Sequence, residues 1–325
     1  MRSTPLVVGA VMAAALVGSA GTARGGSTGA SRNVTVALVS EQVGVQPGRP
    51  FLVGLVMRMR GGWHTYWKNP GDAGLPLRIV WKLPEGFSAG PIQWPVPGRI
   101  PAGPVMSYGY EGEVLLPIEI TPPSRIAADS VTIAGTFDWL ECKEACLAGS
   151  AVLDLTLPVR SEHPRSGPAA SKFDEARSRM PRTPTGWSLS AEAGPRAISL
   201  SVRVPPGFST RGAYFFLDRP LVADLSAPQG FEQAPDGYRI TMTPDPNAPR
   251  PPERLSGVLA FHEGPKNRPV IALQVDVPVV AGDPAPAPVR SEPGRLPTAA
   301  YAAIFGILAL GLALVWSIIR RFHRG

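Results

Sequence analysis

Residues 51–59 read Phe-Leu-Val-Gly-Leu-Val-Met-Arg-Met, an almost wholly apolar run that lies between Pro50 and Gly61. A short apolar run between turn-forming residues is typical of a β-strand in an antiparallel sandwich or barrel. The chain holds 38 prolines and 35 glycines among 325 residues, and these two residue types shorten every regular element. This stretch therefore predicts a mainly β fold built from short strands.

Similar strand-like runs lie on both sides of this one at short intervals. In the first half of the chain they cover 34–39, 77–81, 113–120, 131–137 and 151–157. In the second half they cover 197–204, 213–216, 238–242, 255–261 and 270–277. The two sets predict two β domains, at 33–160 and 187–280, because domains commonly hold about 100–150 residues.

The segments outside these two sets are rich in turn-forming residues. Residues 24–32 are small and polar, and we expect a flexible leader there. Residues 161–186 carry four prolines among several arginines and serines, which predicts an interdomain linker with at most a short helical turn at 172–180. Residues 281–297 are proline-rich and predict a stiff, extended spacer.

The two ends of the chain predict its compartment. Residues 1–23 have a basic start, a short apolar stretch and small residues at the end that suit cleavage by signal peptidase, as in a secretory signal peptide. An uncleaved anchor is the alternative. Residues 299–319 hold no charge over a length of about 31 Å, which matches a bilayer core. We therefore expect a transmembrane helix at 298–319, a basic cytoplasmic tail at 320–325, and a periplasmic body held at the inner membrane.

The formal net charge is +7, and the charged residues make up only 18% of the chain. A basic balance can indicate binding to nucleic acid or to an anionic membrane surface. The basic residues of the body are scattered singly, and the densest cluster follows the predicted transmembrane helix. We therefore expect contact with the membrane and none with nucleic acid.

The only cysteines are Cys142 and Cys146. In an exported protein two cysteines four apart readily meet, and at helical spacing their Cα atoms would be about 6 Å apart. The ring that they close is very small and stabilises a fold least, which favours a redox role over a structural one. No βαβ pattern surrounds the pair, so a thioredoxin fold is not expected.

Metal binding is a competing interpretation of this pair. Cys142, Cys146 and His64 could bind copper(I), with soft help from methionines at 57, 59 or 106. No second CxxC and no HxxxH accompanies them, and so we predict no metal and no cofactor. The aromatic residues of the first half are expected to lie in the core: Trp63, Tyr66, Trp67, Trp81 and Trp94.

Four separated blocks carry a resemblance to a known family. They are Gly-Gly-Trp-His-Thr-Tyr-Trp-Lys-Asn-Pro-Gly-Asp-Ala-Gly at 61–74, Pro-Ile-Gln-Trp-Pro at 91–95, Tyr-Gly-Tyr-Glu-Gly at 108–112, and Trp-Leu-x-Cys-x-x-x-Cys at 139–146. In this order they resemble the N-terminal periplasmic domain of the DsbD/ScsB thiol:disulfide interchange proteins. The resemblance covers 33–160 well and extends more faintly to about residue 280.

The resemblance implies an immunoglobulin-like β fold and a cysteine pair that passes electrons by thiol–disulfide exchange. In the DsbD branch the second cysteine forms the mixed disulfide, which implies this role for Cys146 and a resolving role for Cys142. A cap loop shields the disulfide in that family, and it corresponds here to Tyr108 and Gly109. The family's aromatic residue before the tyrosine is replaced by Ser107, and the spacing of the cysteines resembles the ScsB branch.

The family continues into a multi-span membrane domain and a thioredoxin-like domain, whereas this chain shows one apolar segment without a cysteine. We therefore expect a membrane-anchored periplasmic exchange protein. Its partners would be a separate multi-span membrane electron transporter and periplasmic thiol–disulfide proteins. Two alternatives remain open, namely a non-catalytic β-sandwich interaction module with a structural disulfide and a copper-handling envelope domain.

Overall fold

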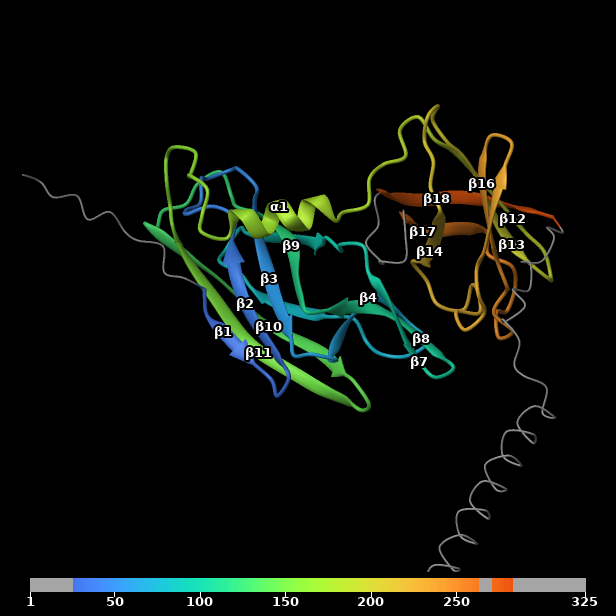
Figure 1. Ribbon diagram of the computed structural model, residues 1–325. Coiled ribbons are helices and arrows are strands. Elements are labelled where there is room, and N and C mark those ends of the chain that lie inside the picture. Colours follow the sequence, from blue (N-terminus) through green and yellow to red (C-terminus); the bar gives the residue numbers. More distant parts are fainter. Residues whose placement is uncertain (1–25, 263–270, 283–325) are drawn as a thin grey trace, which may run out of the picture. The chain divides into compact units, whose positions relative to one another are not determined.

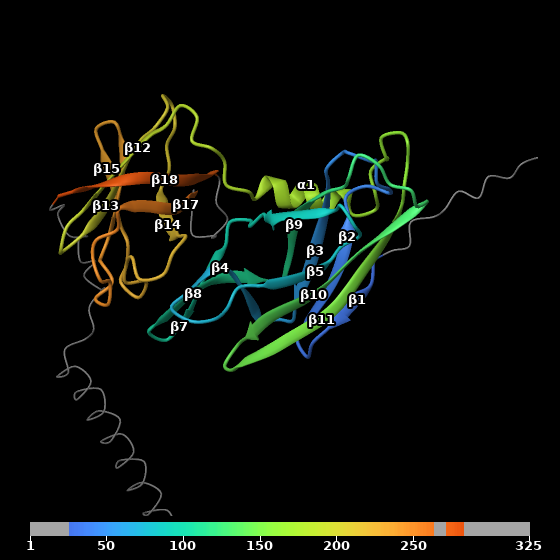
Figure 2. The ribbon, with the colours of Figure 1, turned by 180° about the vertical axis from the view of Figure 1, so that it is seen from behind.

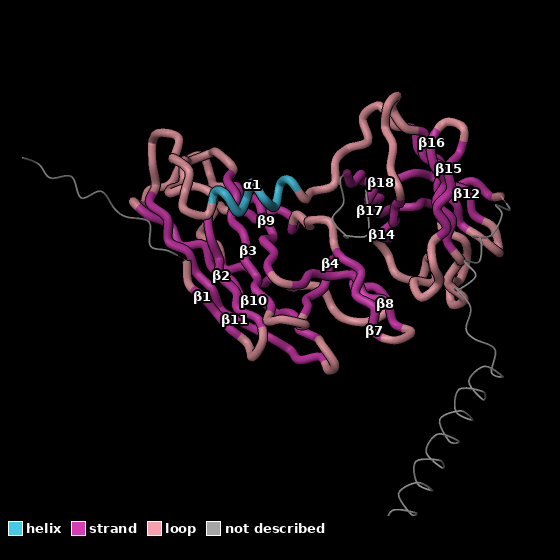
Figure 3. Tube along the Cα trace, viewed as in Figure 1, coloured by secondary structure: helices cyan, strands magenta, loops and turns pink. Residues whose placement is uncertain are grey.

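The computed structural model describes residues 26–262 and 271–282, and within these residues it shows eighteen strands and one short helix (Figures 1 and 3). Contacts divide the chain into Met1–Pro286 and Ala287–Gly325, and every described residue lies in the first unit. The predicted signal peptide, transmembrane helix and tail lie outside the described residues. Inside them, no helix is both long enough and apolar enough to span a bilayer.

The first sheet is wholly antiparallel and brings together strands from the beginning of the body. Its spatial order is β1-β2-β3-β9-β6. Alternate side chains of these strands point inward, which is why β2 buries every second residue. The bounds are β1 (Thr28–Ala30), β2 (Val34–Ser40), β3 (Phe51–Met59), β9 (Glu113–Thr121) and β6 (Ser88–Ile92).

The second sheet carries the cysteines and has the order β11-β10-β4-β8-β7, with β5 paired to β10 beside this path. The hairpin of β10 and β11 keeps one register without interruption over thirteen residues of each strand. Figure 2 shows this hairpin running beside β1 and β2. The bounds are β11 (Cys146–Pro158), β10 (Ser130–Cys142), β4 (His64–Gly71), β8 (Val105–Glu111), β7 (Gly98–Ala102) and β5 (Arg78–Lys82).

The first two sheets share one hydrophobic core. Leu55 and Ile118 from the first sheet and Trp67 and Phe137 from the second are fully buried in it. Each large side chain buried in this way stabilises the fold by about 1.5–3 kcal/mol through the area that it removes from water. The core therefore fixes the strands that lead to the cysteines.

The third sheet holds the strands of residues 188–281 in the order β14-β17-β18-β12-β13-β16-β15. All of its pairs are antiparallel except β12 with β18, which is parallel. Its bounds are β14 (Gly212–Leu217), β17 (Arg254–His262), β18 (Ile271–Ala281), β12 (Ser188–Ala193), β13 (Ile198–Arg203), β16 (Gly237–Met242) and β15 (Gly230–Ala234). The predicted mainly β fold with antiparallel sheets is confirmed, and the immunoglobulin-like topology and the domain boundaries stay predictions.

Two segments differ from the expectation of unstructured connections. Part of the expected leader forms β1, because residues 28–30 pair with residues 35–37 of β2. Part of the expected linker forms the helix α1 (Ala170–Ser178). Phe173 and Ala176, three apart on one helix face, are buried against Val56 and Leu115 of the first sheet. The prolines and charges of this stretch predicted a linker, but packing against the sheet orders it as a helix.

Candidate functional site

The two cysteines lie at the tip of the β10–β11 hairpin. Cys142 ends β10 and Cys146 begins β11, and the two residues face each other across the hairpin. They form a disulfide, and their Cα atoms are 4.2 Å apart. The helical spacing considered from the sequence is therefore wrong, because the chain between the cysteines is the turn of a hairpin.

The backbone pattern of the hairpin determines which way the cysteines present their peptide groups. Val159 N–H donates to the Asp129 carbonyl at 2.8 Å, so the odd-numbered residues of β11 bond to β10. Cys142 and Cys146 therefore form a non-hydrogen-bonded pair, for which a Cα separation of about 4.5 Å is usual. The N–H and C=O of Cys146 consequently point away from β10, toward the outer edge of the sheet.

The two cysteines differ in exposure. Cys142 retains only 3% of its accessible surface, whereas Cys146 is exposed. A thiolate on another protein therefore reaches the sulfur of Cys146 before that of Cys142. The roles that the family resemblance implies, with Cys146 as the attacking residue and Cys142 as the resolving one, stay predictions.

A row of four residues crosses the sheet at the level of the disulfide. Cys146 is paired with Cys142, Cys142 with His64, and His64 with Glu111. Residues paired directly across antiparallel strands share one face, and their Cβ atoms lie about 4.5–5.5 Å apart. The His64 side chain is buried, and this burial lowers the pKa of its imidazole, while the charge of Glu111 acts in the opposite direction. The row thus places a neutral imidazole beside Cys142.

Tyr66 provides the aromatic contact to the disulfide. Its hydroxyl lies 3.5 Å from the Cys146 sulfur, and its ring meets the His64 ring edge-on at 5.2 Å. A disulfide sulfur has no hydrogen, so the hydroxyl is the donor in this contact. Burial raises the pKa of Tyr66, which keeps the hydroxyl protonated. The sequence placed Tyr66 in the core and did not indicate its contact with Cys146.

The loop at 72–74 covers the ring of Tyr66. Gly74 lies so close that a Cβ at this position would be 2.2 Å from a carbon of the Tyr66 ring, which only glycine avoids. The loop is held by Ser107, whose hydroxyl donates to the Ala73 carbonyl at 3.3 Å, and by Asp72, whose carboxylate accepts from the Met106 N–H at 2.8 Å. Hydrogen bonds between the loop and β8 therefore hold this cover over Tyr66.

Tyr108 was expected over the cysteines, but the structure places its side chain elsewhere. Its ring is fully buried and packs against Trp67, whose side chain leaves β4 on the face opposite to that of Tyr66. Its hydroxyl lies 3.1 Å from that of Tyr214 on β14. Gly109 approaches β4 so closely that a Cβ would meet the Thr65 carbonyl oxygen at 2.0 Å. The cap role of Tyr108 and Gly109 therefore stays a prediction that no described contact supports.

Glu141 anchors the hairpin tip from the core side. Its carboxylate is buried, with 1% of the residue exposed, and it accepts hydrogen bonds from the Asn33 side chain at 2.9 Å, the Asn33 backbone N–H at 3.2 Å and the Ser31 hydroxyl. A buried carboxylate is tolerated only when hydrogen bonds of this kind replace its water. The turn between β1 and β2 thus holds the end of β10, which positions Cys142.

Of the residues considered for copper, Cys142, Cys146 and His64 lie next to one another in the row at the disulfide. Among the residues that the structure describes, no group of three or more His, Cys, Asp or Glu side chains could hold a metal ion. Met57 and Met59 are buried in β3, and the Met59 sulfur accepts a contact from the Thr65 hydroxyl at 3.9 Å. The two cysteine sulfurs are bonded to each other.

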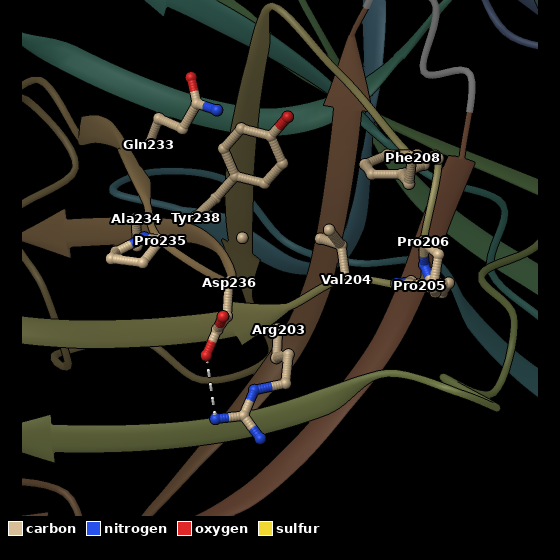
Figure 4. Close-up of a pocket in the computed structure, with 12 residues that line it drawn as sticks. Arg203, Val204, Pro205, Pro206, Phe208, Gln233, Ala234, Pro235, Asp236 and Tyr238 are labelled. Atoms are coloured by element: carbon tan, nitrogen blue, oxygen red, sulfur yellow. Dashed lines mark ion pairs between the residues drawn. The ribbon is translucent and has the colours of Figure 1, made fainter.

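A hollow on the third sheet is shown in Figure 4. Its walls come from residues 203–208 and 233–238, with three prolines and the ion pair of Arg203 and Asp236 at 3.4 Å. Both partners of this ion pair are largely exposed, so it contributes at most about 1 kcal/mol to the stability of the fold. The lining of the hollow contains no cysteine, serine, threonine, lysine or histidine, and the disulfide hairpin remains the candidate site.

Fold and site define a β protein that carries an accessible disulfide at the tip of a hairpin. Residues 36–158 match the family described as "Thiol:disulfide interchange protein DsbD, N-terminal". This stretch is therefore a domain of the DsbD N-terminal family, as its four sequence blocks implied.

The fold is also similar to the crystal structure of the N-terminal periplasmic domain of ScsB from Proteus mirabilis. The TM-score is 0.57 and the sequence identity 18%, over 78% of this chain and 95% of that one. The similarity extends beyond residues 36–158, and at this identity it concerns the fold alone. No curated protein sequence matches the chain.

Proposed function

We propose that the protein exchanges thiols and disulfides through the Cys142–Cys146 pair. The observation that carries the proposal is the exposure of Cys146 beside the burial of Cys142. A structural bridge has no need for one exposed and one buried cysteine, whereas exchange requires attack on a defined sulfur. The match of residues 36–158 to a thiol:disulfide interchange family supports the same chemistry.

The reduction of the disulfide begins at Cys146. The thiolate of a reducing partner attacks the Cys146 sulfur, which forms a mixed disulfide and releases Cys142 as a thiolate. A second thiolate of the partner then attacks the partner sulfur of the mixed disulfide. This step releases Cys146 as a thiolate and leaves a disulfide in the partner. The partner leaves as a disulfide, and the protein holds two thiols.

The oxidation of the pair reverses these steps on a substrate. The Cys146 thiolate attacks the substrate disulfide and releases one substrate thiolate. Cys142 then attacks the Cys146 sulfur, which frees the second substrate thiolate and restores the Cys142–Cys146 bond. One disulfide in the substrate is thereby reduced for each one formed in the protein.

Two neighbours of the cysteines assist this exchange. His64 lies across from Cys142 and is kept neutral by burial, so it can take the proton of the Cys142 thiol as that sulfur attacks. Tyr66 donates its hydroxyl to the Cys146 sulfur, a contact that stabilises a thiolate more than a thiol. His64 thus favours the thiolate of Cys142 when Cys142 attacks, and Tyr66 favours the thiolate of Cys146 when Cys146 attacks.

The setting of this chemistry in the cell is part of the proposal. A signal peptide at 1–23 would export the body, and an apolar helix at 298–319 would hold it at the inner membrane with the tail in the cytoplasm. That apolar segment has no cysteine, so a separate membrane reductase would supply the electrons. Envelope proteins with disulfides would receive them.

The reduction potential of the pair tests the proposed exchange. We expect the isolated body to equilibrate with glutathione or dithiothreitol buffers at a potential above about −300 mV, because structural disulfides in secreted proteins lie below that value. The Cys146→Ser variant, which cannot form the disulfide, provides the background signal for this titration. A potential clearly below that value would favour the structural-disulfide alternative.

A further inference from the structure

The outer edge of β11 next to Cys146 has unpaired peptide groups. Because the odd-numbered residues of β11 bond to β10, the even-numbered ones direct their N–H and C=O away from the sheet. These residues are Cys146, Ala148, Ser150 and Val152, and no hydrogen bond of the described residues reaches their outward groups. β11 is the last strand of its sheet on this side.

The same edge is covered further along the strand. Ser27 N–H donates to the Asp154 carbonyl at 2.8 Å, and Asp154 N–H donates to the Ser27 hydroxyl at 2.6 Å. Gly29 of β1 lies against the next residues back along the strand, because a Cβ at Gly29 would be 2.5 Å from that of Ala151. The open stretch therefore runs from residue 146 to residue 150, about 13 Å of strand. It begins at the exposed cysteine.

This open stretch lacks the features that usually protect a strand edge. Proteins blunt such edges with lysine, proline, bulges or covering segments. Residues 146–150 read Cys-Leu-Ala-Gly-Ser, with no charge and no proline, and their register with β10 has no bulge. Small side chains at 148–150 leave room for another strand. The edge is thus suited to accept an extended chain by β-augmentation.

We propose that this edge binds an extended, cysteine-bearing segment of the redox partner as an added strand. In an antiparallel addition, the partner residue opposite Cys146 would exchange both backbone hydrogen bonds with it, which sets their Cα atoms about 5.5 Å apart. Disulfides join Cα atoms about 4.4–6.8 Å apart. A cysteine at this position of the added strand therefore reaches the Cys146 sulfur without movement of either backbone. The inference rests on the proposed exchange function and specifies its substrate class.

The test compares two probes with the reduced protein. Each probe is a mixed disulfide with thionitrobenzoate, made either from a short strand-forming peptide with one central cysteine or from 2-mercaptoethanol. The Cys146 thiolate attacks the probe and releases coloured thionitrobenzoate, and Cys142 then displaces the peptide or the mercaptoethanol. We expect the peptide probe to react about tenfold faster, in line with one or two added hydrogen bonds.

The variants remove one outward N–H while they keep the hairpin. Ala148→Pro deletes an N–H that β10 does not use, and proline is accepted at strand edges. Ala148→Val is the matched control, because it keeps the N–H. We expect Ala148→Pro to lose the preference for the peptide and to react with the small probe as the control does. A peptide methylated on the backbone nitrogens that face β11 should lose the same preference with the unaltered protein.

The outcomes separate this inference from the proposed function. Equal peptide rates in Ala148→Pro and Ala148→Val, together with no effect of backbone methylation, would overturn the edge proposal while exchange survives. A small-probe rate no higher than that of Cys146→Ser would overturn the exchange function itself. A dimer that Ala148→Pro abolishes, without any preference for the peptide, would assign the edge to a second copy of the chain and also overturn the proposal.

Discussion

At the scale of single residues, the reactivity of the disulfide depends on which side chains reach it. The sequence singled out Cys142 and Cys146, since they are the only cysteines of the chain. It could not place Tyr66 at the Cys146 sulfur, because an aromatic residue in a strand-like run has the same appearance in a core and in a site. Ser31 and Asn33, which hold Glu141, come from a stretch more than a hundred positions away.

The hydroxyl of Tyr66 should make the Cys146 thiol more acidic and more reactive. Tyr66→Phe removes the donor but keeps the ring, so we expect alkylation of reduced Cys146 at neutral pH to slow by about tenfold. Tyr110→Phe is the control, because it also deletes a buried hydroxyl, which here donates to the Pro95 carbonyl. Similar alkylation rates in the two variants would show that Tyr66 only fills space.

His64 should make the folded state sensitive to acid. Burial lowers the pKa of this histidine below its ordinary value of 6.5, so the unfolded chain binds more protons as the pH falls. The contribution to stability is therefore complete above about pH 6.5 and is lost as the pH falls toward the lowered pKa. His64→Gln should flatten this part of the stability curve, measured by urea unfolding between pH 7 and pH 5. An unchanged slope would contradict the role of burial.

At the scale of the elements, several strands could be predicted from their sequence pattern and others could not. The apolar run at 51–59 coincides with β3, and the runs at 131–137 and 151–157 lie within β10 and β11. Strands β4 and β8, which frame the site, were missed because they carry prolines, glycines and polar residues among their aromatics. Their strand state follows from pairing with each other, which local pattern does not reveal.

Helix α1 should contribute to the stability of the first β region. Phe173→Ala empties a fully buried position and should lower the free energy of unfolding by about 3–5 kcal/mol. Lys172→Ala, on the same helix, removes only a partly exposed ion pair with Glu113 and should cost less than about 1 kcal/mol. Equal midpoints of thermal unfolding in both variants would mean that the segment is a linker after all.

At the scale of the whole molecule, we propose that the body is exported, held at the membrane by the apolar segment at 298–319, and supplied with electrons by a separate membrane reductase. Reporter fusions at residue 290 and residue 325 check the arrangement across the membrane. We expect activity of a periplasmic reporter at the first position and of a cytoplasmic reporter at the second, because arginines follow the apolar segment. A periplasmic signal from the fusion at residue 325 would remove the anchor from the proposal.

The central claim is that Cys146 forms a mixed disulfide with a partner and that Cys142 resolves it. The most direct measurement is the amount of covalent complex that each single variant accumulates in living cells, seen on a non-reducing gel and dissolved by reductant. Cys142→Ser removes the resolving thiol and leaves the exposed one, so we expect it to trap a partner, and Cys146→Ser to trap far less. Equal trapping would contradict the assignment of roles. No complex in either variant, together with a wild-type pair that stays oxidised throughout, would contradict thiol–disulfide exchange.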